Sequence, residues 1–170
     1  MPSGLPLLIV IILVALCFDF INGFHDTANA IATSVSTRVL APRAAIVMAS
    51  TLNFLGALVV GTAVAETIGT GIVRPESVTQ MTVLAALLGA IIWNLFTWYL
   101  GLPSSSSHAL VGGIAGAAMQ GGGLSVLNVA GLMRIFGSLL TSPVFGVAAG
   151  FALMVGLMWA FRRHSLSAVN

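Results

Sequence analysis

Long apolar runs, separated by short and mostly uncharged breaks, are the feature that most constrains the fold of this chain. The first run, residues 5–21, is long enough to cross most of the roughly 30 Å hydrocarbon core of a bilayer. Later runs of the same character cover residues 44–64, 78–100, 108–119 and 129–161. Only 6% of the residues are charged, whereas a soluble domain carries about 25%. The sequence therefore predicts an all-α integral membrane protein.

Arginines predict the orientation of the chain. The sequence has no lysine, which excludes the basic surface typical of proteins that bind nucleic acid. Arg38 and Arg43 follow the first apolar run, and Arg162 and Arg163 follow the last. Because cytoplasmic loops are enriched in positive residues, both pairs are expected in the cytoplasm and the N-terminus outside. We expect a multi-pass protein of the plasma or inner membrane.

The first polar break sets two asparagines and an aspartate into apolar sequence. We expect the helix to break at Asn22 and Gly23 and to resume at Thr27. An ionisable side chain at such a depth costs roughly 2.5–3.5 kcal/mol, so Asp26 is interpreted as functional. Its plainer role is the N-cap of the resumed helix. Asn22, Asp26 and Asn29 offer oxygen ligands beside a broken helix, a setting typical of coupling-ion sites.

The second polar break, residues 103–108, places a run of serines after a proline. Ser104, Ser105, Ser106 and Ser107 are expected to begin a helix, where free backbone N–H groups and the positive end of the helix dipole bind anions. Their hydroxyls add donors that suit a tetrahedral oxyanion. Helix capping is the plainer interpretation, and it explains one or two serines better than four at bilayer depth.

The helices on either side of the serines fit two topologies. They form either a re-entrant hairpin with its tip inside the membrane or two full crossings, so the chain crosses the membrane three or five times. Both topologies give the same location of the ends. Gly112 and Gly116 predict a face for close helix packing, and Pro143 predicts a kink in the last helix.

Asp26 and the serine helix fit one binding site if a cation lies between them, because a carboxylate repels phosphate or sulfate. Anion binding that requires a cation first is the chemistry of a symporter, with sodium or a proton as co-substrate. No other cofactor and no structural metal are expected. His25 and His108 adjoin the two motifs and are expected to support them by hydrogen bonds. Asn94 lies within a span, where an interhelical hydrogen bond explains it.

An intramembrane serine protease is disfavoured. Ser107 and His108 are neighbours that point in different directions on a helix, and the chain lacks a Gly-x-Ser-x-Gly motif. We therefore predict that the protein is not an enzyme. A channel stays open as an alternative, since re-entrant segments also line pores, and so does a membrane fragment that does not transport.

The two motifs resemble the signatures of the inorganic phosphate transporter (PiT) family. Residues 22–33, NGFHDTANAIAT, resemble its N-terminal signature, and residues 101–113, GLPSSSSHALVGG, look like its second signature. The resemblance implies uptake of inorganic phosphate driven by sodium or protons; some relatives carry sulfate, and some bacterial members carry a metal-phosphate complex. It also implies that Asp26 and Asn29 belong to the coupling-ion and substrate site and that the four serines bind phosphate.

Members of that family contain two such halves in inverted topology, and this chain resembles the N-terminal half. Residues 1–164 are thus expected to form one transmembrane transporter repeat, followed by a polar cytoplasmic tail at residues 165–170. The resemblance implies that a second inverted half, or another protomer, completes the site within the lipid bilayer.

Overall fold

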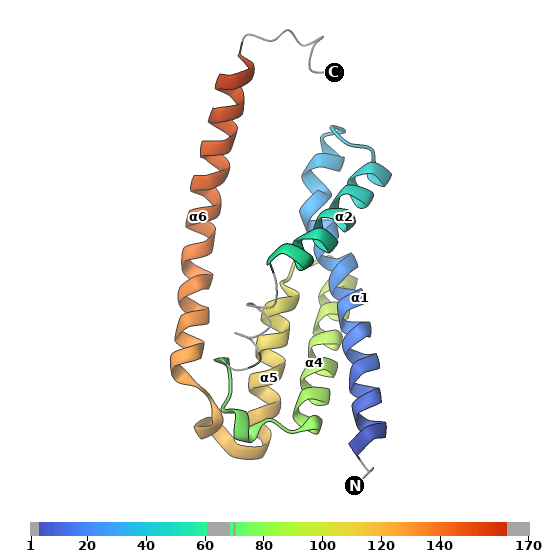
Figure 1. Ribbon diagram of the computed structural model, residues 1–170, viewed down its shortest axis with the longest axis vertical. Coiled ribbons are helices and arrows are strands. Elements are labelled where there is room, and N and C mark those ends of the chain that lie inside the picture. Colours follow the sequence, from blue (N-terminus) through green and yellow to red (C-terminus); the bar gives the residue numbers. More distant parts are fainter. Residues whose placement is uncertain (1–3, 61–68, 70, 163–170) are drawn as a thin grey trace. The chain divides into compact units, whose positions relative to one another are not determined.

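The computed structural model describes residues 4–60, 69 and 71–162, and this part of the chain is built mainly from helices (Figure 1). Among the described residues, five helices are long and apolar enough to cross a membrane, which confirms the prediction of an all-α membrane protein. The chain divides into two compact units, Met1–Val129 and Ala130–Asn170, and each is described by itself. The predicted tail, residues 165–170, lies outside the described residues.

Helix α1, Leu5–Ser36, is continuous over 32 residues, which makes it about 48 Å long at 1.5 Å per residue. The predicted break at Asn22 and Gly23 is therefore wrong. A glycine within a helix costs only about 1 kcal/mol relative to alanine. The proline of α1, Pro6, lies in the first turn, where a missing N–H is tolerated. Asp26 consequently lies within a helix and is not an N-cap.

A short turn joins α1 to α2, Pro42–Val60. The Thr37 hydroxyl donates to a carbonyl of the preceding turn at 2.7 Å, and Arg38, with φ 60°, adopts the left-handed conformation that ends the helix. Pro42 opens α2 as predicted, at a position where the N–H has no helical acceptor. The remainder of the predicted apolar run, residues 61–64, lies outside the described part of the chain.

Helices α4, Gln80–Tyr99, and α5, Ser106–Gly122, form an antiparallel hairpin (Figure 1). Thr79 begins α4 with a capping box, in which its hydroxyl accepts from the Thr82 N–H at 3.1 Å. Gly101 follows the end of α4 with φ 66°, a conformation that glycine adopts without steric cost. The interruption predicted between these two helices is thus confirmed.

The two helices of the hairpin approach each other closely at Gly113 of α5. A Cβ built on Gly113 would lie 2.5 Å from the carbonyl oxygen of Ala86. The predicted packing face at Gly112 and Gly116 is not this contact, because no described atom lies within 4 Å of a Cβ built at either position. Small residues do allow the close approach, but on a neighbouring face of the helix.

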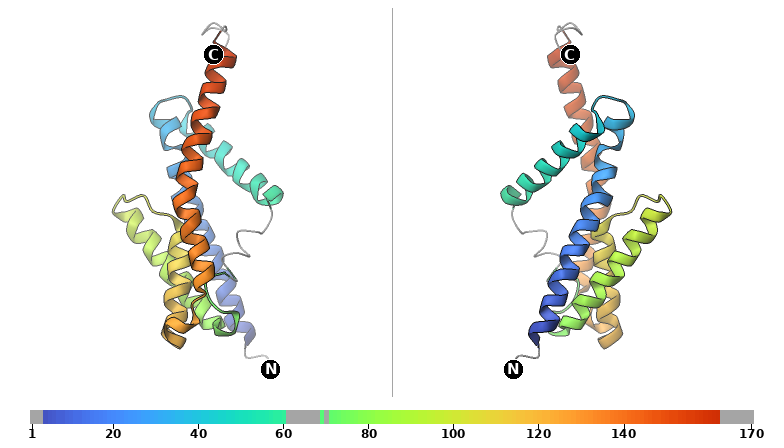
Figure 2. Two further views of the ribbon diagram at one scale, coloured as in Figure 1. Left: turned by 90° about the vertical axis from the view of Figure 1, so that its left-hand side faces the viewer. Right: turned by 90° about the vertical axis from the view of Figure 1, so that its right-hand side faces the viewer.

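Helix α1 packs along the hairpin, as the views from three sides agree (Figures 1 and 2). Ile11 and Phe18 of α1 form a buried cluster with Leu87 and Ala90 of α4. Further along, the buried positions become polar, with His25 on α1 and with Asn94 and Thr97 on α4. The interface between these helices therefore changes from apolar to polar toward the end at which the hairpin turns.

Helix α6, Val129–Phe161, forms the second unit and runs for 33 residues. The helix continues through Pro143, the position of the predicted kink. No residue between the bounds of α6 is classed as buried. The Arg162 guanidinium lies 5.1 Å from the centre of the Trp159 ring, a pairing of cation and aromatic that suits a membrane interface.

Candidate functional site

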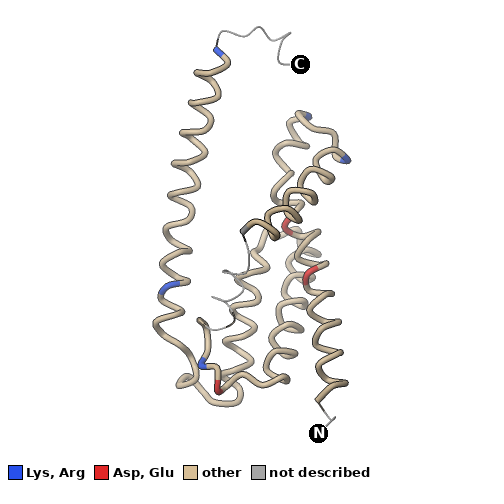
Figure 3. The backbone as a smooth tube through the Cα atoms, viewed as in Figure 1, with Lys and Arg blue, Asp and Glu red and all other residues tan. Residues whose placement is uncertain are grey.

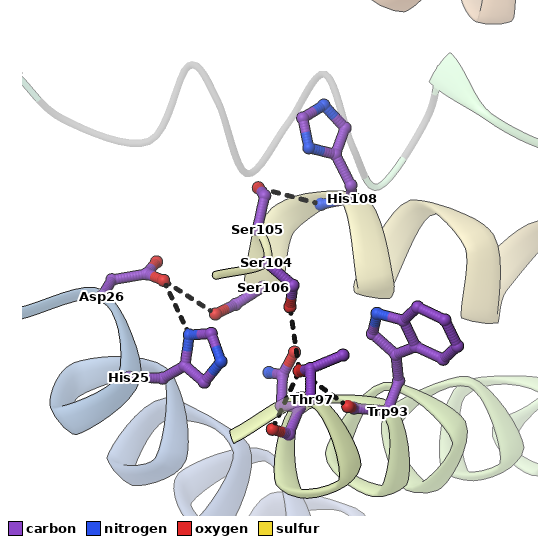
Figure 4. Close-up of polar contacts among 9 residues, drawn as sticks. His25, Asp26, Trp93, Thr97, Ser104, Ser105, Ser106 and His108 are labelled. Carbon is purple, nitrogen blue, oxygen red and sulfur yellow. Dashed lines mark hydrogen bonds and ion pairs between the residues drawn. The ribbon is translucent and has the colours of Figure 1, made fainter. Parts of the chain in front are cut away.

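The two polar motifs predicted from the sequence meet at one contact. The Ser106 hydroxyl at the start of α5 donates to Asp26 Oδ1 on α1 at 3.2 Å, although the two residues are 80 positions apart (Figure 4). Ser106 is only 1% exposed, so this contact is buried on the side of the serine, whereas the Asp26 side chain is 48% exposed. The prediction that the two motifs form one site therefore has a direct structural link.

The four serines have different surroundings at the tip of the hairpin. Ser104 Oγ lies 3.0 Å from Thr97 Oγ1, whose own hydrogen points to carbonyl oxygens of the preceding turn of α4. Ser105 is the N-cap of α5 and accepts from the His108 N–H at a long 3.4 Å. Ser106 is buried against Asp26, whereas Ser107 is exposed. One serine thus fixes the tip to α4, one caps the helix and one reaches α1.

The start of α5 provides hydrogen-bond donors for an anion. The first turn of any α-helix leaves backbone N–H groups without intrahelical acceptors, and the helix dipole adds partial positive charge there. The first intrahelical bond of α5 runs from the Ala109 N–H to the Ser105 carbonyl at 3.0 Å. The N–H groups before Ala109 therefore lie beside the serine hydroxyls, at one end of a helix of 17 residues.

Asp26 faces an opening as well as the hairpin. Its side chain is 48% exposed, and His25 Nδ1 lies 3.4 Å from the same oxygen that accepts from Ser106. The His25 ring is buried, and the adjacent Phe24 ring packs edge to face on Trp98 at 5.7 Å between centroids. The carboxylate is thus anchored on one side and remains open to an ion on the other.

An open pocket of about 300 Å³ adjoins the site, between α1 and the tip of the hairpin. Its lining residues are His25, Ala28, Asn29, Trp98, Gly101, Leu102 and Pro103. Asn29 is therefore on the wall of this pocket, while His108 is exposed on the first turn of α5. No group of three His, Cys, Asp or Glu side chains gathers within the described residues, so a cation near Asp26 would rely mainly on amide, hydroxyl and backbone oxygens.

The sequence led to no prediction for two polar residues, Asp19 and Thr97, and it led to a wrong one for a third, Asn94. Asp19 is exposed on α1 and lies seven positions before Asp26, which is about two helical turns. Figure 3 marks the acidic positions along the backbone in red. Because Asp19 is an acid within an apolar run, it could have been recognised from the sequence as a candidate functional residue. Thr97 gave no signal, because its contact with Ser104 depends on the turn of the hairpin. Asn94 was expected to form an interhelical hydrogen bond, yet both of its side-chain polar atoms are buried without a partner.

Comparison with known proteins agrees with this arrangement. A family model described as "Phosphate transporter family" matches residues 22–169. The chain is 51% identical over 168 residues to a probable low-affinity inorganic phosphate transporter of Bacillus subtilis (strain 168), covering 98% of the chain and 50% of that relative. It is 44% identical to the low-affinity inorganic phosphate transporter PitA of Escherichia coli (strain K12), covering 95% of the chain and 34% of that protein.

A solved structure named "The sodium-dependent phosphate transporter" has the same fold, with a TM-score of 0.81 and 34% sequence identity. The similarity covers 90% of this chain and 39% of the solved one. The chain therefore spans about half the length, or less, of these relatives. Both polar motifs, and the contact between Asp26 and Ser106, fall within the segment that the family model matches, and the chain belongs to the phosphate transporter family.

Proposed function

We propose that this chain is one half of a secondary active transporter that carries inorganic phosphate together with a cation, either sodium or a proton. The observation that supports this proposal most strongly is the 3.2 Å hydrogen bond between Ser106 and Asp26. It joins a carboxylate, which suits a cation, to the start of a helix, which suits an anion. Asn22, Asp26 and Asn29 supply oxygen ligands for the coupling ion, and Ser104, Ser105, Ser106 and Ser107 surround the phosphate.

Electrostatics sets the order of binding. Two unit charges 4 Å apart interact by about 4 kcal/mol at an effective dielectric constant of 20, so a phosphate beside ionised Asp26 is strongly disfavoured. A cation bound to the carboxylate removes most of this repulsion. The Ser106 hydroxyl, which donates to Asp26 in this structure, then turns its hydrogen toward the phosphate. Phosphate binds tightly only after the cation, which is the requirement for coupled transport.

The proposed site is completed by a second half of inverted topology or by another protomer. The Asp26 side chain is half exposed and the adjoining pocket is open, so neither ligand would be fully enclosed by the described part of this chain. The arginine distribution supports an external N-terminus and a cytoplasmic C-terminus in the plasma or inner membrane. Alternating access then follows from movement of one half against the other.

Uptake of labelled phosphate into vesicles tests this function. We expect uptake driven by a sodium or proton gradient to be lost in Asp26→Asn, because the neutral amide no longer attracts the cation. Glu76→Gln is the matched control, since Glu76 is an exposed acid in a short 3-10 helix, Pro75–Ser77, and it should transport normally. If the chain alone takes up no phosphate, it is coexpressed with a complementary second half. Normal uptake by a well-expressed Asp26→Asn variant would rule the assignment out.

Sulfate is the second candidate substrate, because the start of α5 offers the same donors to any tetrahedral oxyanion. Unlabelled sulfate that competes as strongly as unlabelled phosphate would favour it. A channel predicts flux that does not saturate and does not depend on the cation. A fragment that does not transport predicts no uptake even beside a complementary half.

A further inference from the structure

Helix α1 carries an acid that the proposed site does not use. Asp19 lies near the middle of its 32 residues, in a helix that is long and apolar enough to span a membrane. Its side chain is exposed, and among the described residues it has no hydrogen-bond or ion-pair partner. A charged side chain within a membrane span is costly, and such residues almost always face the interior of a helix bundle and pair there. Asp19 therefore calls for a partner that this part of the chain does not supply.

Asp19 belongs to a regular stripe of exposed residues on α1, which we call the second face of α1. Ile12, Leu16, Asp19 and Gly23 follow one another at intervals of four, three and four residues, and all four are exposed. This spacing lines up side chains along one side of a helix and is typical of a face that packs on another helix. A Cβ built on Gly23 would meet no described atom within 4 Å, so a second backbone can approach α1 one turn from Asp19.

The second face is separate from the stripe that packs on the hairpin. The buried residues of α1 are Ile11, Phe18, Ile21 and His25. Because successive residues are about 100° apart around a helix, Asp19 points well away from Phe18. A helix on the second face would thus leave the contacts between α1 and the hairpin in place.

We propose that the second face of α1 packs against a helix of the complementary half, and that Asp19 forms an ion pair with a basic side chain of that helix. This inference rests on the proposed function for the existence of that half, and the chain spans about half the length, or less, of the relatives it matches. Charge complementarity selects the side chain, because a cation compensates a carboxylate that is removed from water.

The other occupants of this face fit less well. In a symmetric contact with a second copy of this chain, the same patch meets itself, which would bring two Asp19 carboxylates together. Lipid tails offer no hydrogen-bond donor and no charge to an acid. A basic side chain from a different polypeptide segment is the partner that satisfies both the charge of Asp19 and the open space at Gly23.

Association of two purified polypeptides in detergent tests this interface. The full chain is titrated with the part of the Bacillus subtilis relative that it does not match, and the dissociation constant is measured. We expect Asp19→Leu to raise that constant by roughly tenfold or more, because the basic partner is left buried and unpaired. The same substitution should raise the thermal midpoint of the chain alone, because it removes an unpartnered acid from an apolar helix. A structural role of Asp19 within this chain would instead lower the midpoint.

Matched variants separate the second face from other surfaces. Gly23→Leu should weaken the association, whereas Gly89→Leu on α4, where a Cβ also meets open space, should not. Glu76→Gln removes an exposed acid outside the long helices and should leave the dissociation constant unchanged. Asp19→Arg should associate weakly, and a glutamate in place of one basic residue in an apolar segment of the added half should restore the association.

Asp19→Asn, which keeps the side-chain volume, replaces Asp19→Leu if the latter does not fold. The proposal is overturned if the folded Asp19 variant associates as tightly as the unmodified chain, if the unmodified polypeptides do not associate, or if no glutamate restores Asp19→Arg. It is also overturned if Gly89→Leu weakens the association and Gly23→Leu does not, because the partner then lies on the hairpin.

Phosphate uptake by the two coexpressed polypeptides separates this result from the proposed function. Association that depends on Asp19, without any uptake, supports the interface and counts against phosphate transport. Uptake together with an association that does not depend on Asp19 overturns the interface alone.

Discussion

Ser106 differs from the serines on either side of it in both burial and partner. It is the buried member of the run, and its hydroxyl crosses to α1, whereas the hydroxyls of Ser104 and Ser105 bind within the hairpin. A hydroxyl can donate one hydrogen at a time. In the proposed mechanism, the Ser106 hydroxyl donates either to Asp26 or to a bound phosphate, and this competition would link the cation on Asp26 to the affinity for the anion.

Ser106→Ala is expected to raise the phosphate concentration for half-maximal uptake by tenfold or more. A hydrogen bond to a charged group contributes about 1.5–3 kcal/mol, and about 1.4 kcal/mol corresponds to a factor of ten. The initial rate of uptake against phosphate concentration measures the effect. Ser125→Ala is the control, because the Ser125 hydroxyl donates to the carbonyl of Gly122 at 2.9 Å, at the opposite end of the hairpin. An equal change in both variants would argue against a phosphate contact.

At the scale of the elements, two helix breaks were predicted from the sequence. The break before the serines is present, whereas the break before Asp26 is not. Pro103 and Gly101 prevent the helix from continuing, so the break before α5 follows from local chemistry. Around Asn22 and Gly23 no residue enforces a break, and α1 remains continuous because its buried face continues on both sides. The sequence also does not show which glycine of α5 packs against α4, because this depends on how the two helices fold against each other.

Gly113→Ala and Gly112→Ala are a matched pair that tests the packing of the hairpin. A Cβ at Gly113 would lie 2.5 Å from the Ala86 carbonyl, so α4 and α5 must move apart. We expect a loss of about 1–3 kcal/mol, as for other overpacked interiors. A Cβ at Gly112 meets open space, and alanine favours a helix by about 1 kcal/mol over glycine, so that variant should be neutral or more stable.

Thermal midpoints of the two variants measure the difference. About 1 kcal/mol shifts the midpoint by roughly 2–4 °C in a chain of this size, so Gly113→Ala should unfold several degrees below Gly112→Ala. The reverse order, with Gly112→Ala the less stable variant, would mean that the face at Gly112 and Gly116 is the packed one.

At the scale of the whole molecule, the depth of the hairpin tip decides how often the chain crosses the membrane. Helix α1 rises about 15 Å from Asp26 to its end at Ser36, which is about half of a 30 Å hydrocarbon core. If Arg38 and Arg43 lie at the cytoplasmic interface, as the sequence predicts, Asp26 and the tip bonded to it are expected near the middle of the membrane. The sequence left three and five crossings open because burial depth depends on this contact between distant segments.

This depth predicts a re-entrant hairpin and three crossings, which cysteine labelling tests in oriented vesicles. In a Cys17→Ser background, Ser36→Cys should react quickly with an impermeant maleimide applied from the cytoplasmic side, because it lies beside Arg38. Leu102→Cys lines the pocket at the tip and should react slowly from either side, and more slowly with phosphate present, since the reagent must enter through the transport site. If Leu102→Cys instead reacts from the cytoplasm as quickly as Ser36→Cys, and phosphate does not protect it, the tip reaches the cytoplasm and the chain crosses five times.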